Sequence, residues 1–329
     1  MKRLPIIALA ISAALPGTVA EAAQTADKDD KPVMLQQPAS TDSLPTFDPN
    51  RFGEKPADEA FGAFQRGLYL TALNLALPRA EKGDPAAQVL AAEIYSRGLG
   101  VPVNPLEAAR WYEKAAAQGV TEAQFRYGAM LLSGKDIPRD KVKAEKLMLA
   151  AAEAGNPMAQ FNYGQLMMAN HPGETGLDKA FPWFRRAAEA RLADGEYAVS
   201  QIYANGTLKI PRDDKKAREY LERAARQNYD TAQLDLASWY IEGRGGPRNY
   251  EAGFRWMHRA AVTGNVAAQA RLARLYRDGI GTEGNSIEAA AWYIVARRAG
   301  LSAHDLDSFM DGLDDNQIKE AIARAGRLR

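Results

Sequence analysis

The sequence contains no cysteine and only three histidines among its 329 residues. Without cysteine the chain forms no disulfide, holds no cysteine-ligated zinc and has no cysteine nucleophile. His171, His258 and His304 are too far apart for a local histidine metal motif. An excess of one charge is also missing, because 42 Lys and Arg residues are balanced by 41 Asp and Glu residues. This balance argues against a nucleic-acid partner, which requires a basic surface.

Long apolar runs are missing too, apart from a short one at the N-terminus. Lys2 and Arg3 precede an apolar stretch over 4–15, and small residues follow it. This order is typical of a secretory signal peptide, so we expect residues 1–22 to be removed by cleavage after Ala20 or Ala22. An uncleaved anchor is the alternative, although the run is short for a membrane span. The prediction places the protein in the periplasm, with no stable membrane span after cleavage.

Residues 23–55 are rich in Pro, Gln, Asp, Ser and Thr and contain few large apolar side chains. Such a composition cannot bury enough apolar surface to offset the entropy of ordering, so we expect a disordered linker. The linker is either a spacer or a segment that carries a linear motif or a protease-accessible site.

From residue 56 onward the chain repeats. A pair formed by a small residue and glutamine recurs in steps of 36 residues, with a single step of 37, and Gly195-Glu196 occupies the one slot where the pair is missing. A second series of paired large residues, which begins at Trp111-Tyr112, also recurs in steps of 36 residues. Its one step of 37 residues falls in the same unit as that of the first series. Two independent series with one shared insertion indicate an internal repeat. The predicted units are 85–120, 121–156, 157–192, 193–229, 230–265 and 266–301.

Each unit contains two helical segments. The first has large, small, large and large residues at the spacings of one helix face. The second has an aromatic or large residue followed four and five residues later by an alanine pair, so we expect Trp183 and Trp256 at the buried position of their helices. Gly-x-Gly runs between the segments follow helices rather than strands, which favours helix termination over phosphate binding.

These features resemble the Sel1-like repeat, a longer-looped relative of the tetratricopeptide repeat. The resemblance implies an all-α fold, a right-handed superhelical solenoid of stacked antiparallel helix pairs over 56–301, with a degenerate opener at 56–84. We expect irregular loops at 171–174 and 205–209. Residues 302–329 do not match the unit, and we expect them to form a helical C-terminal cap. In this cap, Ser302 and Asp305 form a capping box, and Asp315 caps a final helix with Ile318 and Ile322 on its buried face.

The resemblance also implies a concave groove lined by the first helices. The groove positions lie beside the buried set and combine apolar side chains with amides, which suits an extended or helical peptide segment. The alternative is that the aromatic residues fill contacts between repeats. The predicted partner-binding groove consists of Phe125, Leu132, Phe161, Gln165, Met168, Tyr197, Gln201 and Arg274.

The catalytic motifs tested for are missing from the sequence. Ser-x-x-Lys, Gly-x-Ser-x-Gly, His-Glu-x-x-His and an Asp-rich calcium loop do not occur. We therefore expect no enzyme activity, no metal and no cofactor. The predicted function is a periplasmic scaffold that binds a protein partner, such as an envelope sensor or a component of the cell-wall machinery, and restrains envelope signalling or exopolysaccharide control. The alternative is an accessory factor or enzyme that acts on peptidoglycan or other envelope glycans.

Overall fold

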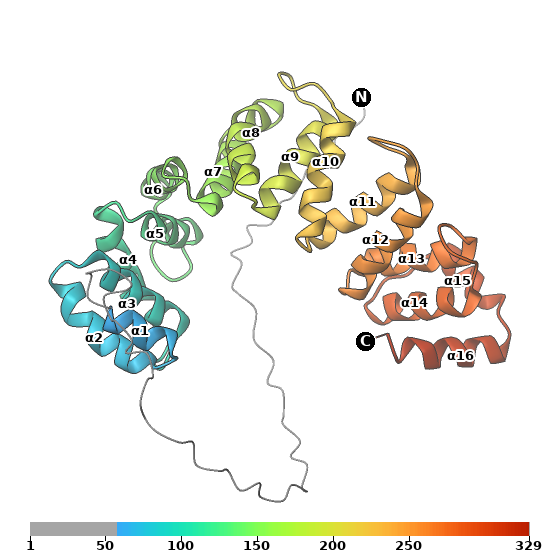
Figure 1. Ribbon diagram of the computed structural model, residues 1–329, viewed down its shortest axis with the longest axis horizontal. Coiled ribbons are helices and arrows are strands. Elements are labelled where there is room, and N and C mark those ends of the chain that lie inside the picture. Colours follow the sequence, from blue (N-terminus) through green and yellow to red (C-terminus); the bar gives the residue numbers. More distant parts are fainter. Residues whose placement is uncertain (1–57, 329) are drawn as a thin grey trace, which may run out of the picture. The chain divides into compact units, whose positions relative to one another are not determined.

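The computed structural model describes residues 58–328, which form sixteen helices and no strand (Figure 1). The predicted signal peptide and linker lie outside the described residues. The helices are α1 (Glu59–Gln65), α2 (Tyr69–Glu81), α3 (Pro85–Arg97), α4 (Pro105–Ala117), α5 (Thr121–Ser133), α6 (Lys141–Glu153), α7 (Pro157–Asn170), α8 (Glu174–Glu189), α9 (Ala193–Asn205), α10 (Asp214–Arg226), α11 (Asp230–Glu242), α12 (Tyr250–Val262), α13 (Val266–Asp278), α14 (Ser286–Arg298), α15 (His304–Asp311) and α16 (Asp315–Ala325).

Helices that follow each other in the chain pack against each other from α1 to α14. Each sequence unit contributes one pair, from α3 and α4 in 85–120 to α13 and α14 in 266–301. A shorter opening pair, α1 and α2, precedes them and packs on α3. The prediction of an all-α solenoid built from stacked helix pairs is therefore confirmed.

Asparagine or aspartate side chains begin many of the helices, and glycine ends several of the first helices. The Asn104 side chain accepts a hydrogen bond from the backbone N–H of Glu107 at 3.1 Å, which satisfies a donor that has no partner inside the helix. Gly98 and Gly243 end their helices with positive φ angles of 66° and 75°, a conformation that other residues adopt at a cost. The first glycine of each Gly-x-Gly run therefore terminates a helix, as the sequence predicts.

The loop between the two helices of a unit has one length in four units and differs in two. Residues 98–104, 134–140, 243–249 and 279–285 form the common loop. In the 193–229 unit the loop covers 206–213, and its additional residue accounts for the 37-residue step. In the 157–192 unit α7 and α8 extend into the loop and leave only 171–173 between them. These two are the loops for which the sequence predicts irregular structure.

In α8 and α12 the buried position lies one residue after the predicted one, whereas in α4 and α14 both residues of the pair are buried. Trp183 and Trp256 are only half-buried, whereas Phe184 is 2% and Met257 is 1% exposed. The prediction of these tryptophans as the core position is wrong, and the alanine pair explains why. In α8, Phe184 lies three and four residues before the pair, at the spacing of one helix face, and Trp183 lies at the edge of that face. Trp183 instead packs edge-on against Tyr163, with ring centroids 4.9 Å apart.

A buried glutamine links four of the units to the helix that precedes them, at a contact that we call the repeat seam. In each case the glutamine Nε2 donates to the carbonyl oxygen of the residue eight positions earlier, near the end of the preceding second helix, at 3.0–3.2 Å. Such a carbonyl lacks the usual donor four residues later in its helix, and its backbone donor is the N–H three residues later, in the turn that follows. The pair of a small residue and glutamine that recurs in the sequence therefore marks the position of this hydrogen bond in four units. The glutamines are Gln88, Gln160, Gln233 and Gln269.

The seam that enters the 193–229 unit uses charge instead. Glu196 is fully buried, and its carboxylate accepts hydrogen bonds from Arg223 Nε at 2.8 Å and from Gln227 Nε2 at 2.6 Å. Arg223 Nη2 also donates to the carbonyl oxygen of Ala188 at 2.7 Å. Ala188 lies eight residues before Glu196, so the arginine supplies the donor that a glutamine supplies at the other seams.

Two further helices follow the last unit as a helical C-terminal cap. Helix α16 packs on α14 through the fully buried Ala321 and Ala325, and Arg324 donates to Glu288 at 2.6 Å.

Three details of the predicted cap are wrong. Helix α16 begins after Asp314, not Asp315, because Asp314 and Gln317 form a capping box. Ile322 lies outside the buried face and is 48% exposed. Helix α15 begins after Ala303, whose side chain cannot accept a cap bond, so Ser302 and Asp305 form no capping box.

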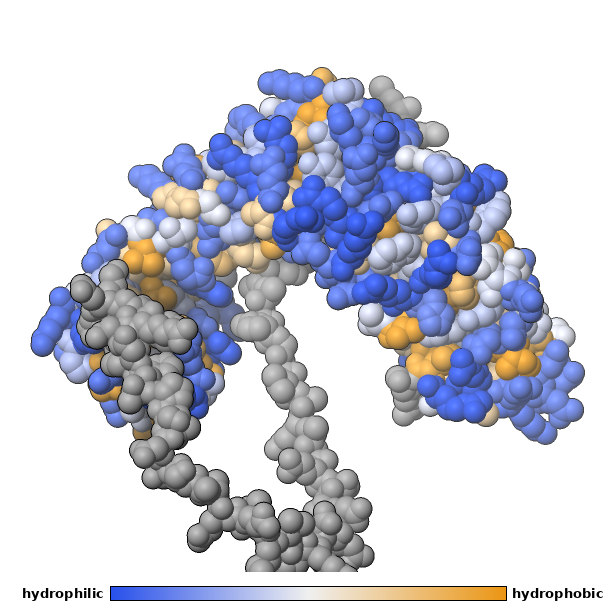
Figure 2. Space-filling view, viewed as in Figure 1, coloured by the Kyte–Doolittle hydropathy of each residue, from blue (hydrophilic) through white to orange (hydrophobic). Residues whose placement is uncertain are grey.

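The described surface is largely polar, with small separate apolar areas on the face that Figure 2 shows. No helix within residues 58–328 has both the length and the apolar character needed to cross a membrane.

Candidate functional site

The predicted groove residues lie on α5, α7, α9 and α13, and we call the side of the first helices that carries them the first-helix face. Phe125 and Phe161 do not form an open part of this face. They are 8% and 7% exposed, and the Phe161 ring centroid is 5.4 Å from that of Phe184 in the core. The prediction that these two rings point into a groove is therefore wrong. The alternative, that they fill contacts between helices, describes them correctly.

Leu132, Gln165 and Met168 remain half-buried on α5 and α7. Leu132 packs against buried residues on both sides of its unit. The Nε2 atom of Gln165 is buried and has no hydrogen-bond partner within residues 58–328. A buried donor without an acceptor is costly, and because this atom is shielded from solvent, a bound chain reaches it only if neighbouring side chains move.

Two residues predicted for the groove, Tyr197 and Gln201 on α9, meet a carboxylate on α11. Tyr197 OH donates to Asp235 Oδ2 at 3.0 Å, and Gln201 Nε2 lies 3.4 Å from the same oxygen. The Tyr197 ring also stacks on Tyr229, with centroids 5.0 Å apart. Neighbouring first helices thus bring together an aromatic platform, an amide and an acid.

This cluster is electrostatically unusual because it is partly removed from water. Burial raises the pKa of Asp235 above its ordinary value of 3.8, and the hydrogen bond from Tyr197 opposes that rise. Burial also raises the pKa of Tyr229 to about 12 and moves the pKa of Tyr197 well above the ordinary tyrosine value. A half-buried carboxyl with a perturbed pKa is a physical marker of a candidate functional site.

Arg274, the last predicted groove residue, is engaged with the C-terminal cap. Its guanidinium forms two hydrogen bonds with the carboxylate of Asp305, at 2.7 and 2.8 Å, and Arg277 lies 3.1 Å from the same group. These two arginines hold the pKa of Asp305 well below its ordinary value. Arg274 is thus part of an ion-pair network within the molecule. Arg271 remains exposed, and its Nη1 donates to Ser238 Oγ at 2.9 Å.

The sequence analysis missed Asp235. At the equivalent position the other units carry Leu90, Arg126, Asn162, Ala198 and Arg271. Asp235 is the only acidic residue at this position among the six units, and that was the only signal in the sequence. The importance of Asp235 depends on α9 lying beside α11. Within residues 58–328 no group of three or more His, Asp or Glu side chains is placed to hold a metal ion.

Comparison with known proteins agrees with the repeats and helix pairs. The family model described as Sel1 repeat matches residues 85–120, 121–156, 157–191, 193–229, 230–261 and 266–301. Among solved structures, a Sel1 repeat protein from Oxalobacter formigenes superimposes with a TM-score of 0.64 and 29% identity, over 75% of this chain and all of that one. A protective antigen of uropathogenic Escherichia coli, described as displaying an SLR fold, gives a TM-score of 0.52 at 24% identity, over 78% of this chain and 63% of that one, and shows the fold alone.

Two fungal sequences are also similar. Chitin synthase regulatory factor 3 of Schizosaccharomyces pombe is 27% identical over 230 residues, which are 68% of this chain and 25% of the relative. A chitin synthase regulator of Malassezia restricta is 31% identical over 110 residues, 33% of this chain and 8% of the relative. The chain therefore spans a quarter or less of the length of these relatives. The six matched units cover well over half of the sequence, and the chain belongs to the Sel1 repeat family.

Proposed function

We propose that this chain is a scaffold that binds a segment of another protein along the first-helix face and thereby regulates that partner. The observation that carries the proposal is the cluster of Tyr197, Gln201 and Asp235, which is built across two neighbouring repeats and is half-buried. The half-buried Gln165 adds a second amide side chain on the same face, with its Nε2 atom shielded from solvent. Stacked repeats present such extended surfaces without a large ordering cost.

The fungal relatives are named as chitin synthase regulators, so each is named for an effect on an enzyme that makes a polysaccharide. This favours a partner that synthesises an envelope polysaccharide or controls its synthesis. Together with the predicted signal peptide, it extends the proposal to a periplasmic protein that restrains an envelope signalling or exopolysaccharide-control system.

The alternative, an enzyme or accessory factor acting on envelope glycans, has less support. Hydrolysis of a glycosidic bond generally requires two carboxyl groups on either side of that bond. Asp235 instead faces a tyrosine hydroxyl and a glutamine amide, which are neutral hydrogen-bond donors.

A crosslinking pull-down from envelope extracts tests the scaffold role. The bait is the full chain, compared with Gln165→Leu and Gln201→Ala variants and with Tyr250→Ala, an exposed aromatic on α12, as the matched control. We expect the two glutamine variants to lose a partner that Tyr250→Ala retains, while all three melt like the unchanged chain. Recovery of no specific partner by the unchanged chain would contradict the scaffold role.

The location is tested separately by N-terminal sequencing of protein from cell fractions. We expect the mature chain to start at Glu21 or Ala23 in the periplasmic fraction. A chain that retains Met1 there would contradict the predicted cleavage.

A further inference from the structure

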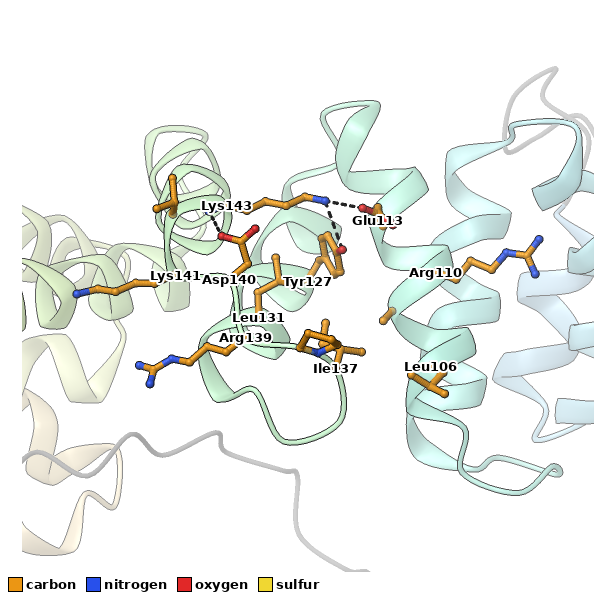
Figure 3. Close-up of a pocket in the computed structure, with 13 residues that line it drawn as sticks. Leu106, Arg110, Glu113, Tyr127, Leu131, Ile137, Arg139, Asp140, Lys141 and Lys143 are labelled. Atoms are coloured by element: carbon orange, nitrogen blue, oxygen red, sulfur yellow. Dashed lines mark hydrogen bonds and ion pairs between the residues drawn. The ribbon is translucent and has the colours of Figure 1, made fainter.

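A hollow of about 670 Å³ lies between α4 and the 134–140 loop, away from the first-helix face (Figure 3). Its apolar lining comes from Leu106, Leu131 and Ile137 together with Ala109 and Pro138. Leu106 and Val142, which also line it, are 64% and 68% exposed, among the most exposed large apolar side chains within residues 58–328. Apolar side chains gathered at one concave place commonly mark an interaction site.

Among the four loops of common length, the loop at this hollow is the one without a second glycine. In the loops 98–104, 243–249 and 279–285, the second glycine has a positive φ of 69–73° and touches the first turn of the preceding second helix. A Cβ at Gly281 would overlap the carbonyl oxygen of Tyr250, and one at Gly245 would overlap that of Asp214. These three loops therefore close directly onto the neighbouring helix.

In the 134–140 loop the equivalent residue is Asp136, and its φ is not positive. This loop cannot take the tight path of the other three, because a side chain stands where they make backbone contact. Leu106, in the first turn of α4, is 64% exposed, and Leu70 at the equivalent position of α2 is 55% exposed.

Charged residues surround the apolar centre, and most of them are basic. Lys143 spans one side, where its Nζ donates to Glu113 and lies 3.4 Å from Tyr127 OH. Figure 3 shows Arg110 extending from α4 on one flank and Arg139 and Lys141 extending on the other. The two acids of the lining are both engaged, since Glu113 pairs with Lys143 and the carboxylate of Asp140 caps α6.

The three flanking cations differ in their engagement. Arg139 and Lys141 form no ion pair with any other residue in 58–328, but Lys141 Nζ donates to Asn170 Oδ1 at 2.6 Å, and Arg110 has an exposed contact of 3.6 Å with Glu107. The hollow is thus an apolar recess with positively charged side chains on both flanks, of which Arg110 and Arg139 are the more available.

We propose that this hollow is a second docking site, for a partner segment in which one large apolar residue is flanked on both sides by Asp or Glu. The apolar side chain occupies the recess beside Leu106 and Ile137, and the acids meet Arg110 on one flank and Arg139 and Lys141 on the other. This inference rests on the proposed scaffold function and names a site and a partner chemistry that the first-helix face does not supply.

The test uses two pools of short fluorescent peptides with a central Leu or Phe, flanked by Glu in one pool and by Lys in the other. Binding to the full chain is measured by fluorescence anisotropy. We expect the Glu pool to bind at least about tenfold more tightly than the Lys pool, because complementary charge selects the partner. Leu106→Ser should weaken binding of the Glu pool by about tenfold or more, as expected for loss of an anchor contact. The double variant Arg110→Glu with Arg139→Glu should reverse the preference between pools.

Two control variants match these changes in chemistry. Val262→Ser removes an equally exposed apolar side chain on α12, and Lys319→Glu reverses an exposed charge on α16. Both should leave peptide binding unchanged. Equal binding of the two pools, no effect of Leu106→Ser, or an equal loss with Val262→Ser would overturn the proposal.

The pull-down separates this inference from the scaffold role. If Leu106→Ser retains every partner that the Gln165 and Gln201 variants lose, and the peptides do not discriminate, the hollow proposal fails and the scaffold proposal stands. If the unchanged chain recovers no partner, the scaffold proposal fails whatever the peptides show.

Discussion

The seams at Gln233 and at Glu196 perform the same task with different chemistry. At Gln233 a neutral amide donates to the Ala225 carbonyl oxygen, whereas at Glu196 a buried carboxylate holds Arg223, which donates to the equivalent carbonyl oxygen of Ala188. The requirement common to both is a donor for the exposed carbonyl at the end of the preceding helix. The comparison teaches that the repeat preserves a hydrogen bond and not a particular residue.

The largest effect is expected from Glu196→Ala. This change removes the carboxylate that accepts from Arg223 Nε and Gln227 Nε2, so it should lower the free energy of unfolding by about 3 kcal/mol, the low end of the range for breaking a buried pair, because Arg223 is partly exposed and keeps the Ala188 carbonyl. Urea unfolding of the full chain measures it. Glu189→Ala is the control, because that carboxylate is 62% exposed and pairs only on the surface. Equal losses of unfolding free energy for the two changes would show that the buried Glu196–Arg223 pair stabilises the fold no more than a surface ion pair does.

A smaller effect is expected at the neutral seam. Gln233→Ala removes the side-chain donor to the Ala225 carbonyl oxygen, which keeps a backbone hydrogen bond from Asn228 N–H at 3.1 Å, and should cost about 0.5–1.5 kcal/mol in urea unfolding. The cost is moderated because Gln233 Oε1 is itself buried without a partner. Gln124 occupies the equivalent position, but no bond from it to the preceding helix is present within residues 58–328, so Gln124→Ala should cost about 0.5 kcal/mol or less. A larger loss at Gln124 than at Gln233 would refute this account of the seam.

The two seams should also be interconvertible. Arg223→Leu alone leaves the buried Glu196 carboxylate unpaired, but the double change Glu196→Gln with Arg223→Leu recreates the neutral seam. Replacement of a buried ion pair as a unit is often nearly neutral, so the double variant should unfold within about 1.5 kcal/mol of the unchanged chain. A double-mutant cycle measures the coupling. Additive losses would mean that the glutamine cannot replace the arginine here.

The smallest expected effect is the pH dependence of stability that arises from Asp235 on the first-helix face. The pKa of Asp235 is raised by burial, so the folded state binds this proton more tightly than the unfolded chain does. Its contribution to stability is therefore fully present below the ordinary value of 3.8 and is lost as pH rises through the raised pKa. Asp235→Asn should accordingly gain melting temperature relative to the unchanged chain between about pH 4 and about pH 7.

Thermal melts across that range measure the difference. Asp311→Asn, a change at an exposed acid at the end of α15, is the control. A flat profile for Asp235→Asn would show that the cluster is fully hydrated.

The candidate site was only partly predictable from the sequence. The 36-residue spacing located Tyr197 and Gln201 correctly on the half-buried face. The same spacing misplaced Phe125 and Phe161, because a residue beside the buried set is still covered when the helix it faces carries a large side chain such as Phe184. Asp235 could not be selected, since its interest comes from its contact with α9 and from no pattern in its own unit.

The sequence by itself determined the period, the two helices of each unit and most of their ends. These features are local: helix faces follow the spacing of apolar residues, Asn104 and Asp213 cap nearby N–H groups, and Gly98 or Gly243 adopts a positive φ. The tertiary structure alone decided which face of α8 is buried, how Arg223 substitutes for a glutamine, and that a hollow lies beside Leu106. These depend on how closely helices and loops from different units approach each other, which no single unit of the sequence encodes.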